Sequence, residues 1–381
     1  MPTELMPIER ACELVLARVS PLPSEEVALR NCIGRHLAAD VASGEDIPAF
    51  DNSAMDGYAV RSADVAAATT DRPARLRLAG ESSAGHPAEA EVGAGEAFAI
   101  STGAAVPAEN NIRRAGEDVR AGARVLSAGA RLGAAEVGAI AAVGHPAATC
   151  ARRPRLALLL TGDELVEPGE PLGPGQIRDS NAYAVPPLAE AAGAEVVSIE
   201  IAPDNHEGTL AALDRALRAD VVVVCGGISV GEHDHVRPAL AELGAEEVFW
   251  RVALRPGKPT YFGIGPGGKP VFGLPGNPVS AMVTFLLFAR PALIAMQGGD
   301  PASHRVEAAL TERYETVAGR AEAIRVGLEA GRGGWEATPT GPQGSHVLTS
   351  MIGADGLAVV PTEVDVVEAG DPVTVELLGW G

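Results

Sequence analysis

Acidic side chains follow three of the predicted strands, close to the point where each strand ends. Glu164 comes just after the apolar run 156–160, Asp204 follows the strand that begins at residue 195, and Asp234 lies beyond the run 221–224. The carboxyl ends of strands in an open parallel sheet form one crevice, where we expect these carboxylates. Carboxylate oxygens suit Mg²⁺ bridging phosphates. Nearby, His233 and His235 leave a softer metal open, although two neighbouring histidines are more often ordinary surface or hydrogen-bonding residues.

Two loops, one after the run 221–224 and one after the strand 269–272, are rich in glycine. Glycines allow backbone N–H groups to approach an anion closely, and the helix N-terminus after each loop adds a favourable partial charge. This pattern predicts a phosphate cradle, while turns that happen to be glycine-rich remain the alternative. Neither loop is a Walker loop, and no GxGxxG fingerprint follows a first strand. The residues expected to contact an anion here are Gly226, Gly227, Ser229, Gly231, Pro275, Asn277 and Pro278.

Positive groups gather in the run 250–260. Arg251 and Arg255 fall on one face of an extended segment, and Lys258 is one of only two lysines in the chain. A solvated strand explains one exposed arginine easily but explains this group less well. Guanidinium groups bind oxyanions through a planar fork, so we interpret the run as an oxyanion pocket.

A further polar loop lies at residues 50–59 (FDNSAMDGYA) and includes Ser53 and Asp56. Its turn-forming residues explain the composition without any function. A ligand-facing loop explains it as well, and the two interpretations stay open at this stage.

The elements that must position these residues alternate from residue 154 onward. Apolar strands at 156–160, 195–199, 221–224 and 269–272 alternate with helical patterns, and a long buried helix follows Asn277. This alternation predicts an α/β multidomain chain whose parallel sheet is covered by helices on both faces. We expect an elongated N-terminal domain at 1–46 and 112–150, an inserted β module at 47–111, the α/β domain at 151–302 and a C-terminal β domain at 303–381.

Composition excludes several classes of function. The formal net charge of −20 over 381 residues argues against binding to nucleic acid or to an anionic membrane, which both need a basic face. The four cysteines form no CxxC pair, so neither a zinc site nor a disulfide framework is indicated. No secretory signal is visible and the most apolar stretch, 281–296, is interrupted by Arg290 and Pro291. We expect a soluble, cytoplasmic protein.

Eight motifs in order resemble the MoeA family of molybdopterin molybdenumtransferases, which includes the gephyrin E domain. They are FDNSAMDGYA, STGA, IRRAGED, TGDEL, GGISVG, RPGKP, GLPGNPVS and TGPQGSH. The resemblance covers nearly the whole chain. It implies a molybdopterin-binding type of α/β domain, a β-barrel-like C-terminal domain, and a homodimer whose site lies between the α/β domain of one subunit and the β module of the other.

The resemblance also implies an activity: adenylylated molybdopterin and molybdate give the molybdenum cofactor and AMP, with Mg²⁺. It assigns catalysis to Asp56, Thr102, Glu164 and Asp234, with Glu164 and Asp234 as metal ligands. It places Ser53, Asp204, Arg251, Arg255, Lys258, Arg325 and Ser350 around the substrates. Molybdopterin adenylyltransferase and molybdenum enzymes are the partners it suggests.

The chain departs from the family pattern in two places, and two alternative functions stay open. Arg251 and Arg255 stand where the family often has lysine, and the stretch between Pro107 and Ile112 is short, which would trim the β module. The chain could instead be a molybdopterin adenylyltransferase, which shares a similar α/β domain, or a scaffold that binds peptides as the gephyrin E domain does.

Overall fold

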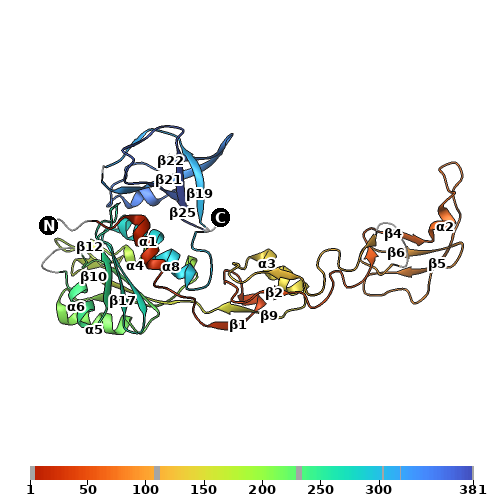
Figure 1. Ribbon diagram of the computed structural model, residues 1–381, viewed down its shortest axis with the longest axis horizontal. Coiled ribbons are helices and arrows are strands. Elements are labelled where there is room, and N and C mark those ends of the chain that lie inside the picture. Colours follow the sequence, from red (N-terminus) through yellow and green to blue (C-terminus); the bar gives the residue numbers. More distant parts are fainter. Residues whose placement is uncertain (1–4, 107–111, 229–233, 303, 318, 380–381) are drawn as a thin grey trace. The chain divides into compact units, whose positions relative to one another are not determined.

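The computed structural model describes residues 5–106, 112–228, 234–302, 304–317 and 319–379. It divides into two compact units, one formed by Met1–Glu25 with Ala151–Gly381 and the other by Glu26–Cys150 (Figure 1). The first 25 residues thus group with the α/β and C-terminal domains, whereas the sequence-based limits assigned them to the N-terminal domain. The reason is the helix α1 (Ile8–Leu16), whose Ile8, Ala11 and Val15 belong to the main core of the first unit.

A six-stranded sheet forms the centre of the α/β domain, in the order β13-β10-β14-β18-β17-β15. Four strands are parallel, as the sequence predicts: β13 (Glu195–Ala202), β10 (Arg155–Thr161), β14 (Val221–Cys225) and β18 (Lys269–Leu274). The other two, β17 (Tyr261–Gly265) and β15 (Glu246–Trp250), were not predicted, and β17 runs antiparallel to both of its neighbours. The sheet is therefore mixed rather than entirely parallel.

Helices cover both faces of this sheet because successive strand residues point to opposite sides. In β10, Leu156, Leu158 and Leu160 belong to one core cluster, while Ala157 and Leu159 belong to another. The first cluster contains α1 and residues of α4 (Asn181–Ala191), α7 (Pro278–Thr284), the π-helical segment η2 (Phe285–Ala289) and α8 (Arg290–Ala295). The second contains residues of α5 (His206–Ala216) and α6 (Val236–Glu242).

The segment Pro278–Ala295 is long and apolar enough to cross a membrane by length and composition alone. However, 83% of it is buried inside the protein, where it packs as the predicted core helix. Two short strands, β11 (Leu165–Val166) and β12 (Ile177–Arg178), pair beside the main sheet.

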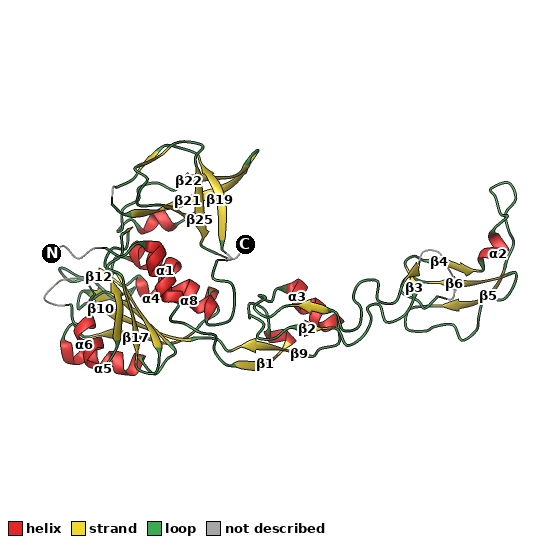
Figure 2. Cartoon of the chain, viewed as in Figure 1, coloured by secondary structure: helices red, strands yellow, loops and turns green. Residues whose placement is uncertain are grey.

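The C-terminal domain is built on a second sheet that closes on itself, in agreement with the predicted barrel (Figure 2). Its order is β16-β21-β22-β19-β25-β23, and an additional pairing of β21 with β23 closes the ring. The strands are β16 (Leu254–Arg255), β19 (Arg305–Leu310), β21 (Ala321–Gly331), β22 (Gly334–Pro339), β23 (Gly356–Val360) and β25 (Pro372–Leu377). A small pair, β20 (Tyr314–Glu315) with β24 (Val366–Val367), and the 3-10 helix η3 (Leu348–Met351) complete the domain. Because β16 precedes the C-terminal domain in sequence, it carries the basic run into that domain's sheet.

The second unit contains two small cores. One lies around α3 (Ala134–Ala142), η1 (Leu29–Asn31), β2 (Val41–Ala42) and β8 (Arg124–Leu126), with β1 (Ser24–Ala28) pairing β9 (Ala147–Ala151). The other is β-rich and corresponds to the predicted β module at 47–111, extended by the strand Ile112–Arg113. It consists of β3 (Asn52–Ser53), β4 (Gly57–Val60), α2 (Ser62–Val65), β5 (Arg77–Ser82), β6 (Glu96–Ile100) and β7 (Ile112–Arg113). The shortened stretch 107–111 lies outside the described residues.

Candidate active site

The loops after β10, β14 and β18 meet around a cavity of about 350 Å³, which we call the carboxylate cavity. Seven of the residues singled out in the sequence line it together: Glu164, Gly226, Gly227, Asp234, Pro275, Asn277 and Pro278. Asn181, which the sequence analysis did not select, and Thr161, the first residue of the TGDEL motif, also line it. The loops after β10, β14 and β18 therefore converge, whereas Asp204, expected in the same crevice, is not among the lining residues.

Close backbone packing explains the glycines of this cavity. Gly226 has a φ of +95°, and a Cβ placed on it would lie 2.7 Å from the Thr161 hydroxyl oxygen. Gly227 has a φ of +62°, and its Cβ would meet Val236 at 2.8 Å. Only glycine accepts both the positive φ and the contact. The backbone of this loop thus lies directly against the end of β10.

Asn181, at the start of α4, joins that helix to one of the cavity loops. Its side-chain amide donates to the carbonyl oxygen of Gly276 at 2.8 Å, which ties α4 to the loop after β18. Its Oδ1 atom is buried and has no hydrogen-bond partner among the residues that the structure describes. A buried acceptor without a donor carries a desolvation cost.

The carboxylate cavity fits a magnesium ion that is shared with a substrate. Among the described residues no group of three or more His, Cys, Asp or Glu could hold a metal by itself. Mg²⁺, however, is usually held by one or two carboxylates together with waters and substrate phosphates. Glu164 and Asp234 supply two such carboxylates on one cavity.

A second cavity, of about 400 Å³, adjoins the first and has the opposite charge; we call it the basic cavity. Its lining includes Arg255, Lys258 and Arg320, and none of its described lining residues is Asp or Glu. Both cavities share the lining residues Pro259, Pro275 and Asn277. These three shared residues form a wall between the cavities, with Glu164 and Asp234 on one side and Lys258 on the other.

The C-terminal domain forms part of the basic cavity. Gln343, Gly344, Ser345 and His346 line it, and the side chain of Asn277 donates to the Ser345 hydroxyl at 3.2 Å. These four residues belong to the TGPQGSH motif, so that motif has a place in the site.

The buried carboxylate of Glu322, in the C-terminal domain, anchors Arg255. In the parallel pairing of β16 with β21, Arg255 lies opposite Glu322, and the two side chains form an ion pair at 3.3 Å. Glu322 is only 2% exposed and also accepts a hydrogen bond from the Tyr314 hydroxyl at 2.9 Å. Burial, followed by the charge of Glu322, raises the pKa of Tyr314. Glu322 therefore fixes the position of Arg255 and offsets its charge.

Arg251 takes a different position from the other basic residues of the run. Its guanidinium lies over the Trp250 ring, 4.1 Å from the ring centroid, and its φ is +71°. The Trp250 indole donates to the Ile228 carbonyl at 2.8 Å, so Trp250 joins Arg251 to the second glycine loop. Arg251 is not among the residues lining either cavity. The same is true of Asp204, whose backbone amide donates to Asp163 at 3.2 Å.

Arg325 and Ser350, predicted as a pair, contact each other inside the C-terminal domain. The Arg325 guanidinium donates to the Ser350 hydroxyl at 3.2 Å and to the Gly344 carbonyl at 3.3 Å. The side chain is fully buried, and burial lowers its pKa. In this structure it holds the loop that carries Gly344 and does not itself line the basic cavity.

The predicted residues of the β module also lie together. Asp56 accepts hydrogen bonds from the backbone amide of Thr102 at 2.7 Å and from its hydroxyl at 3.0 Å. Ser53 forms a turn by donating to the Met55 carbonyl at 2.6 Å, and its own carbonyl accepts from Gly103. The backbone and hydroxyl donors of Thr102 lower the pKa of Asp56. Ser229, Gly231 and His233 lie outside the described residues.

Comparison with known proteins identifies the family. Residues 157–295 match the family described as a probable molybdopterin binding domain. Residues 6–110 and 108–144 match the MoeA N-terminal region, and residues 307–378 match the MoeA C-terminal region. The molybdopterin molybdenumtransferase of Haemophilus influenzae is 35% identical over 93% of this chain and 94% of its own length. The chain belongs to the MoeA family.

Other MoeA relatives agree over nearly the full length. Molybdopterin molybdenumtransferase 2 of Mycobacterium tuberculosis is 36% identical over 92% of this chain and 94% of its own length. A molybdopterin biosynthesis MoeA structure from Pyrococcus horikoshii covers 98% of this chain and 100% of its own, at 28% identity and a TM-score of 0.83. The chain is thus a transferase enzyme of molybdenum cofactor biosynthesis, with molybdopterin and molybdate as substrates.

Proposed function

We propose that this MoeA-family enzyme transfers molybdenum from molybdate to adenylylated molybdopterin, releasing AMP, in a reaction that depends on Mg²⁺. The two adjoining cavities of opposite charge are the observation that carries the proposal. A basic cavity attracts a tetrahedral oxoanion, and a neighbouring carboxylate cavity suits the metal-bound phosphoanhydride of a nucleotide conjugate. A substrate spanning both cavities would bring its reacting groups close together.

In the basic cavity, Lys258 and Arg255 would bind the oxoanion. Lys258 contributes an exposed ammonium group, while Arg255 contributes a planar fork whose position Glu322 fixes. These groups hold the oxoanion before the reaction, so the entropic cost of orienting it is paid on binding.

In the carboxylate cavity, Glu164 and Asp234 would hold Mg²⁺, which neutralises charge on the phosphoanhydride when bound. The backbone at Gly226 and Gly227 carries no side chain, so the substrate would approach it closely. Together these groups orient the bond that breaks.

Purified enzyme should be incubated with adenylylated molybdopterin and Mg²⁺, with and without molybdate, while AMP is followed by liquid chromatography. We expect AMP release only when molybdate is present. AMP release independent of molybdate, or no release at all, would contradict the proposal. ATP consumption with free molybdopterin would indicate an adenylyltransferase instead.

The proposal includes a homodimer in the cytoplasm, in which Asp56 and Thr102 of one subunit complete the site of the other. Two inactive variants test this: D56A lacks the β-module carboxylate, and E164Q lacks the carboxylate of the α/β domain. When they are mixed in equal amounts and allowed to exchange subunits, half of the dimers carry both variants and one intact site each. We expect about one quarter of the wild-type activity to return. No recovery would mean that each chain forms its own site.

A further inference from the structure

Trp250, the last residue of β15, donates its indole N–H to the carbonyl oxygen of Ile228 at 2.8 Å. Ile228 is buried and lines the carboxylate cavity together with Gly226 and Gly227. We propose that Trp250 is a positioning residue, which fixes the backbone of the loop after β14 where the nucleotide end of the substrate binds. The inference rests on the proposed function, because it concerns the same cavity.

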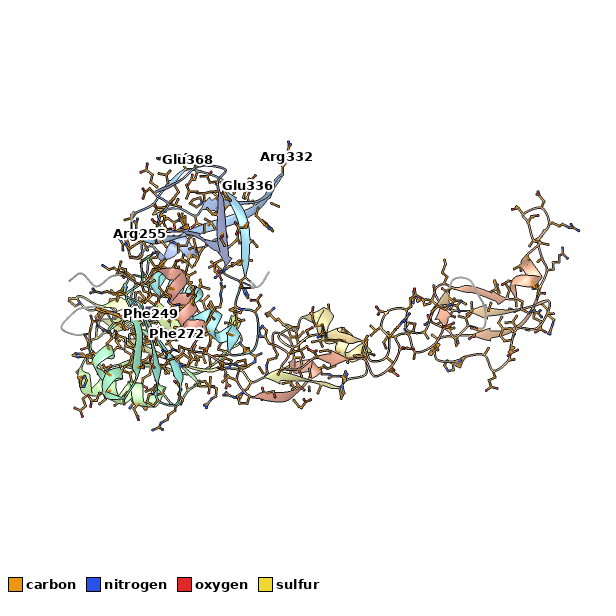
Figure 3. All side chains as sticks on the ribbon, in the orientation of Figure 1. Phe249, Arg255, Phe272, Arg332, Glu336 and Glu368 are labelled. Carbon is orange, nitrogen blue, oxygen red and sulfur yellow. The ribbon has the colours of Figure 1, made fainter. Side chains whose placement is uncertain are left out.

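The strand directs Trp250 away from the main core and toward α6. Phe249, the residue before it, belongs to the core cluster that contains Phe272 (Figure 3). Successive residues of a strand point to opposite faces of the sheet, so Trp250 lies on the other face. There it packs against the second core cluster, which includes Ile228 and residues of α6. Trp250 does not itself line the carboxylate cavity, so it acts on that cavity through Ile228.

Two guanidinium groups hold the Trp250 ring. The guanidinium carbon of Arg237, from α6, lies 3.7 Å from the ring centroid, and that of Arg251 lies 4.1 Å from it. Arg237 is itself fixed by an ion pair with Glu247 at 2.9 Å. A cation over an aromatic face is attracted by the negative charge of that face. The ring is thus oriented by contacts that do not involve its N–H group.

The backbone after Trp250 joins this arrangement to the basic cavity. Arg251 has a φ of +71°, a region that favours glycine, and such positions persist where the surrounding structure holds them. Its amide donates to the Thr260 carbonyl at 2.9 Å, and the amide of Val252 donates to the Lys258 carbonyl at 3.0 Å. Lys258 lines the basic cavity. Trp250 therefore contacts one cavity wall through its side chain, while the backbone that follows it is bonded to the other.

Loss of the indole donor should loosen one wall of the carboxylate cavity only. Gly226 and Gly227 both have a positive φ, and glycine has the widest backbone freedom of any residue. Without the N–H group, the carbonyl of the buried Ile228 loses this partner, which is unfavourable. The substrate must then order the loop when it binds, and this ordering weakens binding. The backbone bonds to Thr260 and Lys258 do not depend on the indole.

Two replacements of Trp250 separate the hydrogen bond from the ring. W250F keeps an aromatic face for the guanidinium groups and removes the N–H donor. Replacement of Trp250 by benzothienylalanine keeps the bicyclic ring and puts sulfur in place of the N–H group. W335F is the matched control, because Trp335 is an exposed tryptophan of the C-terminal domain that lines neither cavity.

The full-length proteins are titrated calorimetrically with AMP in the presence of Mg²⁺, and separately with sodium molybdate. Thermal unfolding followed by circular dichroism checks that each variant is folded. We expect both replacements of Trp250 to weaken AMP binding about threefold to tenfold, and W335F to leave it unchanged. Molybdate binding should stay the same in all of the proteins.

Two results would overturn the assignment of Trp250. If the benzothienylalanine variant binds AMP as tightly as wild type, the N–H group has no positioning role. If AMP and molybdate binding weaken equally, the replacement loosens the fold in general. In both cases the proposed function stands as long as wild-type protein releases AMP in the presence of molybdate. If wild-type protein does not bind AMP, the nucleotide site of the proposed function fails, and the role of Trp250 fails with it.

Discussion

Asp56 accepts two hydrogen bonds from Thr102, although 46 positions separate them in the sequence. The two bonds, at 2.7 and 3.0 Å, join the FDNSAMDGYA loop to the STGA loop of the β module. Both residues are exposed, so the interaction is formed at the surface of the module and orients the Asp56 carboxylate there.

The Asp56 pKa provides a test of this interaction. The backbone amide of Thr102, followed by its hydroxyl, lowers the pKa of Asp56 in the folded protein. T102V keeps the amide donor and removes the hydroxyl donor, so the pKa should rise part of the way toward its ordinary value, while T102S should leave it low. Carboxyl titration by NMR measures the shift.

The same pKa has a consequence for stability. A carboxyl whose pKa is lowered on folding stabilises the module above the ordinary carboxyl range near pH 4, and this stabilisation is lost as the pH falls through the folded pKa. The loss of stability of the module on acidification should therefore be smaller in D56N, because the asparagine amide does not titrate. An identical acid transition in D56N and wild type would show that Asp56 does not contribute.

Glu164, on the loop after β10, and Glu170, between β11 and β12, provide a matched pair. Both are exposed, but only Glu164 lines the carboxylate cavity. We expect E164Q to reduce the rate of AMP release by about a hundredfold or more, because a carboxylate needed for charge neutralisation is lost. E170Q should behave like wild type. Equal rates in all three proteins would exclude a role for Glu164.

Gly226 should not tolerate a side chain. In G226A, the new Cβ would lie 2.7 Å from the Thr161 hydroxyl oxygen and 3.1 Å from its carbonyl oxygen, so the loop must shift. Gly244 is the control, since it has a similar φ of +83° but nothing within 4 Å of an added Cβ. Both variants carry the strain of a positive φ, about 1–2 kcal/mol. Only G226A should lose substrate binding, measured as an increased KM.

The sequence predicted the parts of the site that follow regular apolar strands. The runs that became β10, β14 and β18 are continuous and buried, so their ends, and hence Glu164, Gly226 and Asn277, could be located. Strands β15 and β17 were missed because charged residues and a Pro-Gly turn interrupt the apolar pattern between residues 246 and 265. As a result, Arg251 was expected beside Arg255, whereas a positive φ directs it onto Trp250.

Contacts that depend on the tertiary structure could not be predicted. Arg320 has no periodic pattern around it, and only the structure places it beside Arg255 in the lining of the basic cavity. Asn181 had an ordinary place at the start of a helix, and only the structure shows that its Oδ1 is buried without a partner. Arg325 has a residue type that suits anion binding, but its complete burial is a property of the closed sheet.

A buried ion-pair group connects α8 to the C-terminal sheet. Glu376 pairs with Arg290 at 2.7 Å, where both side chains are 4% exposed, and with the half-exposed Arg305 at 2.8 Å. E376A leaves Arg290 buried without its carboxylate, which should destabilise the first unit by about 3–5 kcal/mol. E368A removes an exposed pair with Arg313 and should cost less than about 1 kcal/mol. Urea unfolding compares the two, and equal midpoints would contradict the expectation.

The contrast between the basic cavity and the acidic chain around it affects how quickly an oxoanion arrives. The chain carries a formal net charge of −20, so a dianion is repelled at long range and attracted only near the cavity. Dissolved ions shorten the reach of the repulsion to roughly 8–10 Å at physiological ionic strength, while contacts inside a pocket are screened less. Capture of the dianion should therefore become faster when salt is added, the reverse of the trend for enzymes that steer anionic substrates with a basic surface.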